Sequence, residues 1–284
     1  MTSMSSEPRA VAIPIPGGRI EAIVLPGGPG RPLLVLGGVE IGLRPLAGSE
    51  AAHRRRWERR TARRPVVIMG RPLPDDPADA ASMLHPRAAA EAVATGLAAL
   101  SGVGPPYAIE AESGGGRISL WLTVDHPELV SRLVLSSVAS ETPPDSAMTA
   151  RMSQWLELAE RGAWADFFAR LALQLKPAGS VTADADPLPG GLQPRPATPE
   201  RFIGELRATL DPSSFVTSRL GEISVPTLVL AGGKDQVVPP ASTQLVAERI
   251  PGAQFMVDPE CGHSVRGSFA GYDELVEAFL SEGD

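Results

Sequence analysis

The feature that most constrains this fold is a series of short apolar runs, bounded mostly by glycine or proline, that alternates with longer segments of helical pattern. Each run is too short for a typical helix and suits a buried strand. Such alternation predicts a mostly parallel α/β sheet with helices on both faces. The expected strands are 33–36, 66–69, 107–111, 133–138, 227–231 and 254–257, and the expected helices are 49–63, 86–101, 115–124, 240–250 and 269–281.

The chain is expected to open with an antiparallel hairpin. Residues 10–15 and 19–25 alternate apolar and polar side chains, and they flank the pair Gly17-Gly18. Two glycines between two alternating runs favour a tight two-residue turn. With this hairpin, the predicted sheet has eight strands.

One segment, residues 141–220, interrupts the alternation. It shows no strand pattern and has three helical stretches, at 147–159, 164–175 and 199–210. An apolar insert between two parallel strands is expected to lie over their carboxyl ends, where ligands bind in such folds. We therefore predict a core formed by residues 1–140 and 221–284 and a helical cap formed by 141–220. The alternative is an excursion that only extends the core.

The predicted cap concentrates large aromatic side chains. Trp155, Trp164 and Phe168 are candidates for the wall of a substrate pocket.

Charge and hydropathy exclude several classes of function. The formal net charge of −7 argues against a polyanion partner. The arginine-rich segment 53–64 suggests nucleic-acid binding, but a solvated helix face is the preferred interpretation. No run of about 18 apolar residues and no signal-peptide core is present, so we expect a cytoplasmic protein without membrane contact. The single cysteine, Cys261, allows neither an internal disulfide nor, alone, a metal site.

Ser113 is the first candidate for chemistry, because it lies where a predicted strand meets a predicted helix. In a sharp strand-to-helix turn, the residue at the apex projects from the sheet, and the residues two before and two after it must be small. Ala111 and Gly115 meet this requirement. A serine that only begins the helix and a glycine-rich phosphate-binding turn are the alternatives.

Asp235 and His263 follow the last two predicted strands, at the same edge of the sheet. A serine hydroxyl needs a histidine to accept its proton, and the histidine needs a carboxylate to fix its tautomer. Glu141 and Asp145 are alternative acids. We interpret Cys261 as an incidental thiol, because it shares the loop of His263 and does not lie at the turn.

In this order, Ser113, Asp235 and His263 resemble the nucleophile, acid and histidine of the α/β-hydrolase family. The stretch 125–135 and the Gly-Lys-Asp-Gln-Val-Val-Pro loop around Asp235 are also similar to that family, and the insert occupies the position of its cap. The resemblance implies a serine hydrolase that needs neither metal nor organic cofactor. A serine nucleophile argues against the haloalkane dehalogenases and epoxide hydrolases of the family.

Three positions depart from the family pattern. Ala111 replaces a glycine, Gly37 replaces the histidine of a His-Gly pair, and residues 70–75 replace an Asp-x-x-Gly-x-Gly loop. Because a backbone donor needs no particular side chain, the N–H groups of Val39 and Gly114 remain the predicted oxyanion hole.

The expected partner is a small, largely hydrophobic acyl compound, and the chain is expected to be a monomer or a homodimer. Esterase, lactonase, thioesterase, carbon–carbon bond hydrolase and perhydrolase activities stay open. The rival interpretation is a non-hydrolytic member of the family that binds a small ligand or acts as a lyase.

Overall fold

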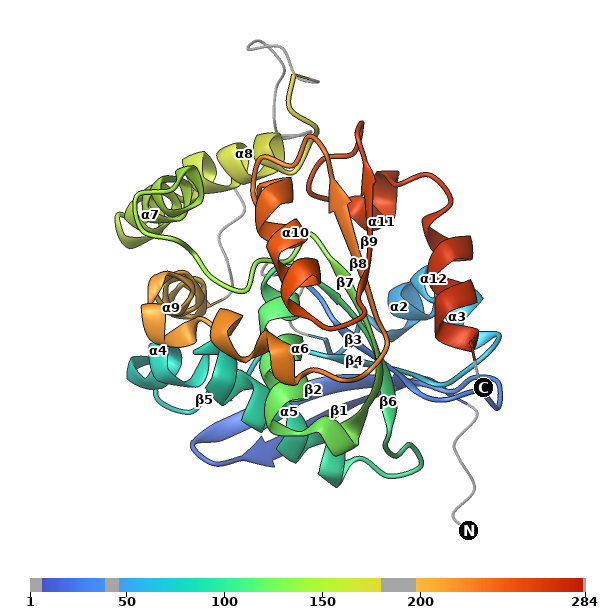
Figure 1. Cartoon of the computed structure of the whole chain (residues 1–284). Helices are drawn as coiled ribbons and strands as arrows, with labels where there is room; N and C mark the ends of the chain where they lie inside the picture. The colour runs from blue at the N-terminus through green and yellow to red at the C-terminus, as the bar shows by residue number, and fades with distance from the viewer. Residues whose placement is uncertain (1–6, 39–45, 180–197, 283–284) are drawn as a thin grey trace.

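The computed structural model describes residues 7–38, 46–179 and 198–282, and it contains one mixed sheet (Figure 1). The order of the strands is β1-β2-β4-β3-β6-β7-β8-β9, and β5 pairs with β2 beside this path. Both neighbours of β2 in the path are antiparallel to it, and the strands from β4 to β9 are parallel. The strands are Arg9–Ile15 (β1), Gly18–Leu25 (β2), Leu33–Leu36 (β3), Val66–Met69 (β4), Leu73–Pro74 (β5), Tyr107–Glu112 (β6), Val130–Ser136 (β7), Thr227–Gly232 (β8) and Gln254–Asp258 (β9).

The predicted eight strands are therefore confirmed, and the two-residue β5 is an addition. A pair of residues is too short to produce a periodic pattern, so β5 could not be predicted from the sequence.

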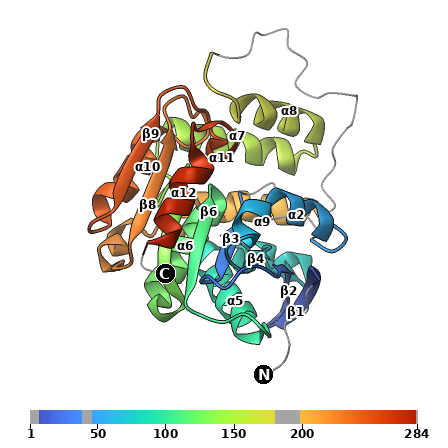
Figure 2. The same cartoon turned by 90° about the vertical axis from the view of Figure 1, so that its right-hand side faces the viewer.

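Helices cover both faces of the sheet (Figures 1 and 2). On one face, α5, α6 and α10 pack against every second residue of the strands, such as Leu34. On the other face, α12 and Trp57 pack against the strand residues in between, such as Leu33. This division follows from the two-residue period of strands. The helices are Glu50–Arg56 (α2), Glu58–Thr61 (α3), Ala80–Met83 (α4), Pro86–Ala99 (α5), Gly114–Asp125 (α6), Ala147–Glu160 (α7), Trp164–Gln174 (α8), Pro199–Leu210 (α9), Pro240–Arg249 (α10), Val265–Ser268 (α11) and Tyr272–Ser281 (α12).

The arginine-rich helix differs from its prediction in two ways. It is divided at Trp57, which is buried against the sheet. The interpretation as a solvated face holds for the exposed arginines, such as Arg54 and Arg59, but not for Arg60 and Arg64. These two are each 1% exposed and form ion pairs with Glu110 and Glu277. Carboxylates on distant segments stabilise these two charges. The local sequence pattern around the arginines does not indicate these contacts.

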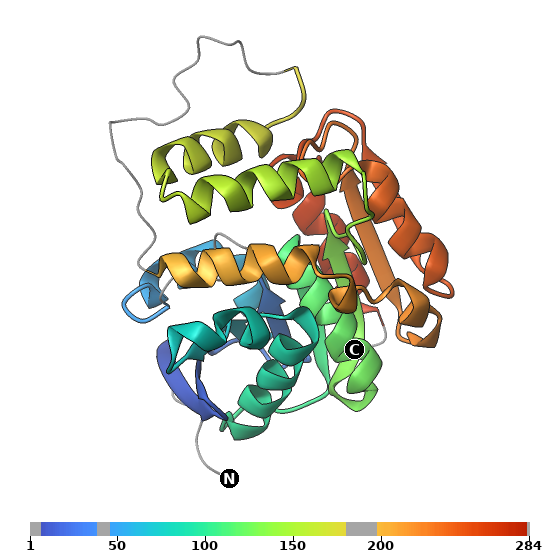
Figure 3. The same ribbon diagram turned by 90° about the vertical axis from the view of Figure 1, so that its left-hand side faces the viewer.

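The helices of residues 141–220 pack together and against the core (Figure 3). Helix α9 lies between α7 and α4, and a Cβ placed on Gly204 of α9 would be 3.0 Å from the carbonyl carbon of Ala80. The two helices therefore pack closely at this glycine, and a side chain here would require α4 to shift by a few tenths of an ångström. Residues 180–197, between α8 and α9, lie outside the described residues.

Candidate active site

Ser113 occupies a strained turn between β6 and α6. Its backbone has φ 52° and ψ −124°, which is uncommon for a residue other than glycine. Its N–H donates to the carbonyl oxygen of Ser136 at 3.0 Å, and its own carbonyl accepts from Gly116 N–H at 2.9 Å. These bonds hold the serine at the apex, and strain of this kind gathers at functional sites.

Small residues allow this turn to approach the neighbouring strand. A Cβ placed on Gly115 would be 2.2 Å from the carbonyl oxygen of Leu36, so no side chain fits there. Ala111, the departure from the family pattern, is buried on β6. A methyl group is thus accommodated two residues before Ser113.

The side chains of Ser113, His263 and Asp235 form one hydrogen-bonded chain. His263 Nε2 lies 3.0 Å from Ser113 Oγ, and His263 Nδ1 lies 2.8 Å from Asp235 Oδ2. The other carboxylate oxygen, Asp235 Oδ1, accepts from the N–H groups of Val237 at 2.7 Å and Val238 at 2.9 Å. The aspartate is thereby fixed by the main chain and can hold the imidazole with Nε2 directed at the serine.

The alternative acids, Asp145 and Glu141, and the thiol of Cys261 are not part of this hydrogen-bonded chain. Asp145 stands before α7 with φ 59°, and Glu141 acts electrostatically on Arg117. Cys261 Sγ contacts Ser268 Oγ at 3.0 Å, and burial raises the pKa of the Cys261 thiol. A raised pKa lowers the thiolate fraction, which agrees with an incidental thiol.

The predicted oxyanion hole is only partly described. Gly114 is the first residue of α6, directly after Ser113. Val39 lies outside the described residues, but Gly38, just before it, is close to the serine. A Cβ placed on Gly38 would be 3.4 Å from Ser113 Cβ and 3.9 Å from Oγ.

A cavity of about 290 Å³ opens beside Ser113 and His263. Helices of residues 141–220 supply much of its apolar wall, including Met152, Trp155 and Leu171. Trp155 is fixed by a hydrogen bond from its indole Nε1 to Gln174 Oε1 at 2.9 Å. The segment predicted as a cap therefore does contribute side chains to this cavity.

Of the three predicted pocket aromatics, only Trp155 lines the cavity beside Ser113. Trp164 and Phe168 pack instead in a cluster with Phe167 and Phe202, in which ring centroids lie 5.0 to 6.4 Å apart. Trp155 contacts Phe167 of this cluster edge-on at 6.1 Å. The four clustered rings therefore pack against one another, and Trp155, which contacts them through Phe167, is the aromatic residue that lines the cavity.

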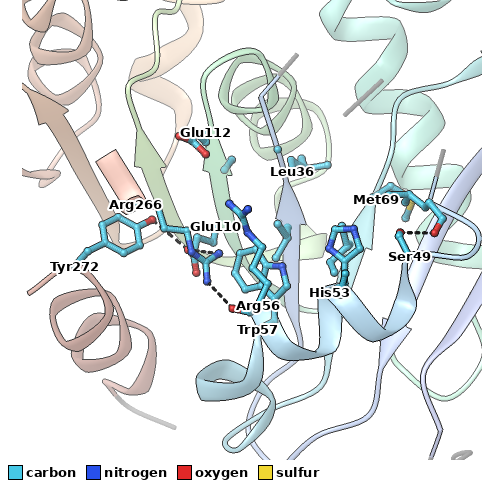
Figure 4. A pocket seen from close by; sticks show the side chains of 16 residues that line it. Leu36, Ser49, His53, Arg56, Trp57, Met69, Glu110, Glu112, Arg266 and Tyr272 are labelled. Atoms are coloured by element: carbon cyan, nitrogen blue, oxygen red, sulfur yellow. Dashed lines mark hydrogen bonds and ion pairs between the residues drawn. The ribbon is translucent and has the colours of Figure 1, made fainter. Parts of the chain in front are cut away.

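A second cavity, of about 280 Å³, is lined by residues of β3, β4, β6 and α2, among them His53 and Glu110 (Figure 4). Arg56, Glu112 and Arg266 line both cavities, so these two spaces share one wall. Arg266 stacks on Trp57, with its guanidinium carbon 3.5 Å from the ring centroid, and pairs with Glu110 Oε1 at 3.4 Å. The ion pairs of Glu110 with Arg60 and Arg266 were not predicted from the sequence. The only signal for them was a glutamate within an apolar strand.

The described part of the chain contains no cluster of three or more histidine, cysteine, aspartate or glutamate side chains arranged to hold a metal ion. A membrane-spanning helix is likewise absent from the described residues, since none of their helices is both long and apolar enough.

Comparisons with known proteins agree with this geometry. Residues 91–267 match the model of the serine aminopeptidase S33 family. The chain is 30% identical over 212 residues to a pimeloyl-[acyl-carrier protein] methyl ester esterase of Neisseria meningitidis, covering 68% of this chain and 63% of that protein. It is also 30% identical over 181 residues to the 2-hydroxymuconate semialdehyde hydrolase of Pseudomonas putida, covering 62% and 63%. The matches thus span less than two thirds of these relatives.

Solved structures share the fold. An α/β hydrolase from a Medee basin deep-sea metagenome library superposes with a TM-score of 0.76 at 17% identity, covering 94% of this chain and 96% of that one. The enol-lactonase of Burkholderia xenovorans gives a TM-score of 0.70 at 15% identity, covering 95% and 100%.

Proposed function

The chain belongs to the α/β-hydrolase family, and from this premise we propose that it is a serine hydrolase of esters or related acyl compounds. The observation that carries the proposal is the hydrogen-bonded chain from Ser113 Oγ through His263 to Asp235 Oδ2, with the serine at a strained strand-to-helix turn. This arrangement activates a hydroxyl that is otherwise a weak nucleophile.

In the proposed reaction, Ser113 Oγ attacks the carbonyl carbon of the substrate, and His263 Nε2 takes the serine proton. Asp235 stabilises the imidazolium that forms. The N–H groups of Val39 and Gly114 stabilise the negative oxygen of the tetrahedral intermediate. His263 then gives its proton to the leaving alcohol, and an acyl ester on Ser113 remains. Water hydrolyses this ester, with His263 again accepting and returning a proton.

The proposal includes a cap formed by residues 141–220 over a core of 1–140 and 221–284. The apolar wall beside Ser113 favours a small, largely hydrophobic acyl group. The similarity to a methyl ester esterase supports an ester as the first class to assay, and 2-hydroxymuconate semialdehyde as a second compound. A cytoplasmic location remains part of the same proposal.

A series of p-nitrophenyl esters from acetate to octanoate tests this function. The wild-type protein should hydrolyse members of the series, and Ser113→Ala should lower kcat by about a thousandfold or more. Absence of turnover with the wild type across esters, lactones and thioesters would contradict the proposal. It would favour the non-hydrolytic, ligand-binding alternative.

A further inference from the structure

The cavity beside Ser113 combines apolar walls with positive charge. The insert contributes apolar side chains, among them Trp155 and Leu171. The core contributes two guanidinium groups, from Arg56, the last residue of α2, and from Arg266 of α11. Figure 4 shows both arginines where they also line the second cavity. A ligand in the cavity beside Ser113 therefore meets apolar surface and cationic donors together.

The charge of Arg266 is compensated by a cluster of ion pairs. Arg266 Nη1 lies 3.4 Å from Glu110 Oε1, and Glu110 Oε2 lies 3.1 Å from Arg60 Nε. Two further carboxylates pair with Arg60, those of Asp273 at 3.2 Å and of Glu277 at 3.4 Å. The carboxylates of this cluster therefore already neutralise Arg266.

Arg56 has no such partner within the described part of the chain. Its side chain forms no ion pair and no hydrogen bond there, although its carbonyl oxygen accepts from Arg266 Nη2 at 3.4 Å. The acid that interacts with it electrostatically is Glu112, but burial raises the pKa of that carboxyl and disfavours its charged form. The other acid of this cavity, Glu205, is bound by Arg71 at 3.1 Å. The positive charge of Arg56 is therefore left uncompensated at the cavity.

We propose that Arg56 binds a carboxylate at the far end of the acyl chain, so that the preferred substrate is the monoester of a dicarboxylic acid. This inference rests on the proposed function and names its substrate class. Arg56 and Ser113 line one cavity, and the apolar wall with Trp155 and Leu171 suits the methylene groups between the two ends of such a chain. A guanidinium group matches a carboxylate because its planar N–H donors bind both oxygens.

The test compares substrates that differ only in the charge at the far end. Monomethyl esters of succinic, adipic and suberic acid are paired with methyl esters of the same length in which an amide replaces the free carboxyl. The readout is the ratio of kcat/KM for the acid to kcat/KM for the amide. A general loss of activity in a variant cancels in this ratio, because both substrates use the same reacting groups.

The wild-type protein should prefer the acid by about ten- to a hundredfold at one or more chain lengths, the usual effect of a hydrogen bond to a charged group. Arg56→Gln should lower the ratio to within twofold of one, and Arg56→Lys should keep part of the preference. Because Arg56 is exposed and its side chain forms no bond, Arg56→Gln should fold, and its Tm checks this. A wild-type ratio near one at every chain length, or an unchanged ratio in Arg56→Gln, would overturn the proposal.

Long-range attraction by the arginine-rich helix is one competing explanation, and Arg55→Gln is its matched control. Arg55 is the exposed neighbour of Arg56 on α2, and it lines neither cavity. The substitution removes the same charge, so the ratio should stay within twofold of wild type. An equal loss of preference in Arg55→Gln would overturn the specific role of Arg56.

The other competing explanation is that Arg56 only compensates Glu112. In that case Arg56→Gln would change Tm and leave the ratio as it is in wild type. Glu112→Gln should keep the preference for the acid, because the carboxylate of the substrate pairs with Arg56 and not with Glu112. A ratio that fell as far in Glu112→Gln as in Arg56→Gln would overturn the proposal.

Binding without turnover separates this inference from the proposed function. Ser113→Ala keeps Arg56 and cannot form the acyl ester, so calorimetry measures the Kd of the intact monomethyl ester of adipic acid and of its amide counterpart. The acid should bind at least tenfold more tightly than the amide, and adding Arg56→Gln should remove the difference. Equal affinities in Ser113→Ala would overturn the inference, even if the wild-type protein hydrolyses esters.

Discussion

The sheet edge and the helical insert contribute to the site in different ways. At the edge, main-chain groups fix the candidate reacting side chains: two N–H groups bind Asp235, and a strained backbone presents Ser113. In the insert, Trp155 is held by a side-chain bond to Gln174 and by ring packing. Main-chain anchors do not depend on neighbouring side chains. From this comparison we expect the edge to determine whether chemistry occurs and the insert to determine which acyl group fits.

Apart from the loss of the nucleophile in Ser113→Ala, the largest effect on activity should come from the edge, at Asp235. Asp235→Asn offers an amide where His263 Nδ1 donates, so it favours the wrong tautomer. By analogy with serine proteases, we expect kcat/KM to fall by about ten-thousandfold. Asp145→Asn is the matched control and should stay within twofold. If Asp145→Asn lost activity and Asp235→Asn kept it, the acid would belong to the insert and the comparison would fail.

An intermediate effect is expected at Trp155, the aromatic of the insert that lines the cavity. Burial of one large apolar side chain against a ligand contributes about 1.5–3 kcal/mol, or roughly ten- to a hundredfold in binding. Trp155→Ala should therefore raise KM for long acyl chains by that factor and leave acetate turnover nearly unchanged. Kinetics across the acyl-length series measure this, and an unaltered chain-length preference would remove Trp155 from the substrate site.

Trp164 tests the other half of the insert, because it belongs to the aromatic cluster and does not line the cavity. Trp164→Ala should lower the free energy of unfolding by about 3–5 kcal/mol, the usual cost of truncating a buried tryptophan. The partly buried Phe168 should give a smaller loss. Chain-length preference should not change in either variant. A shifted preference with unchanged Tm would place these rings at the substrate after all.

The smallest effect concerns pH and Glu112, which lines both cavities. Burial raises the pKa of the Glu112 carboxyl above its ordinary value of 4.5. The folded state thus retains this proton when the unfolded chain releases it, so stability falls as pH rises from 4.5 to the raised pKa. Glu112→Gln should remove that decline and raise Tm at neutral pH relative to wild type. Thermal melts from pH 4 to 8 measure the difference, and parallel curves for both proteins would contradict the assignment.

The sequence predicted the elements and the candidate triad because both depend on local patterns. Leu33–Leu36 is apolar at every position and became a central strand. Ser113 and Asp235 follow the buried strands β6 and β8, whereas His263 follows β9, an edge strand that is largely exposed although its apolar residues predicted a buried one. Contacts between segments that are distant in the sequence could not be predicted, because they do not produce a local pattern. The pairing of Arg71 with Glu205 joins residues 134 positions apart, and nothing near either residue indicates the other.

Side-chain direction was the second limit. Trp155 and Trp164 are both aromatic residues on predicted helices, and the sequence treats them alike. Their roles diverge because α7 presents Trp155 to the cavity, whereas Trp164, at the start of α8, packs against Phe202 of α9. The direction of each side chain depends on how the three helices of the insert pack together, and the local sequence does not show this.

The most direct test of the account is to map where a fluorophosphonate probe reacts. Such a probe modifies a serine only when a neighbouring base activates it. We predict a single adduct on the peptide that contains Ser113, formed by the native protein and absent after heat denaturation or in Asp235→Asn treated for the same short time. No adduct, or an adduct on another serine, would contradict the assignment of Ser113 as the nucleophile.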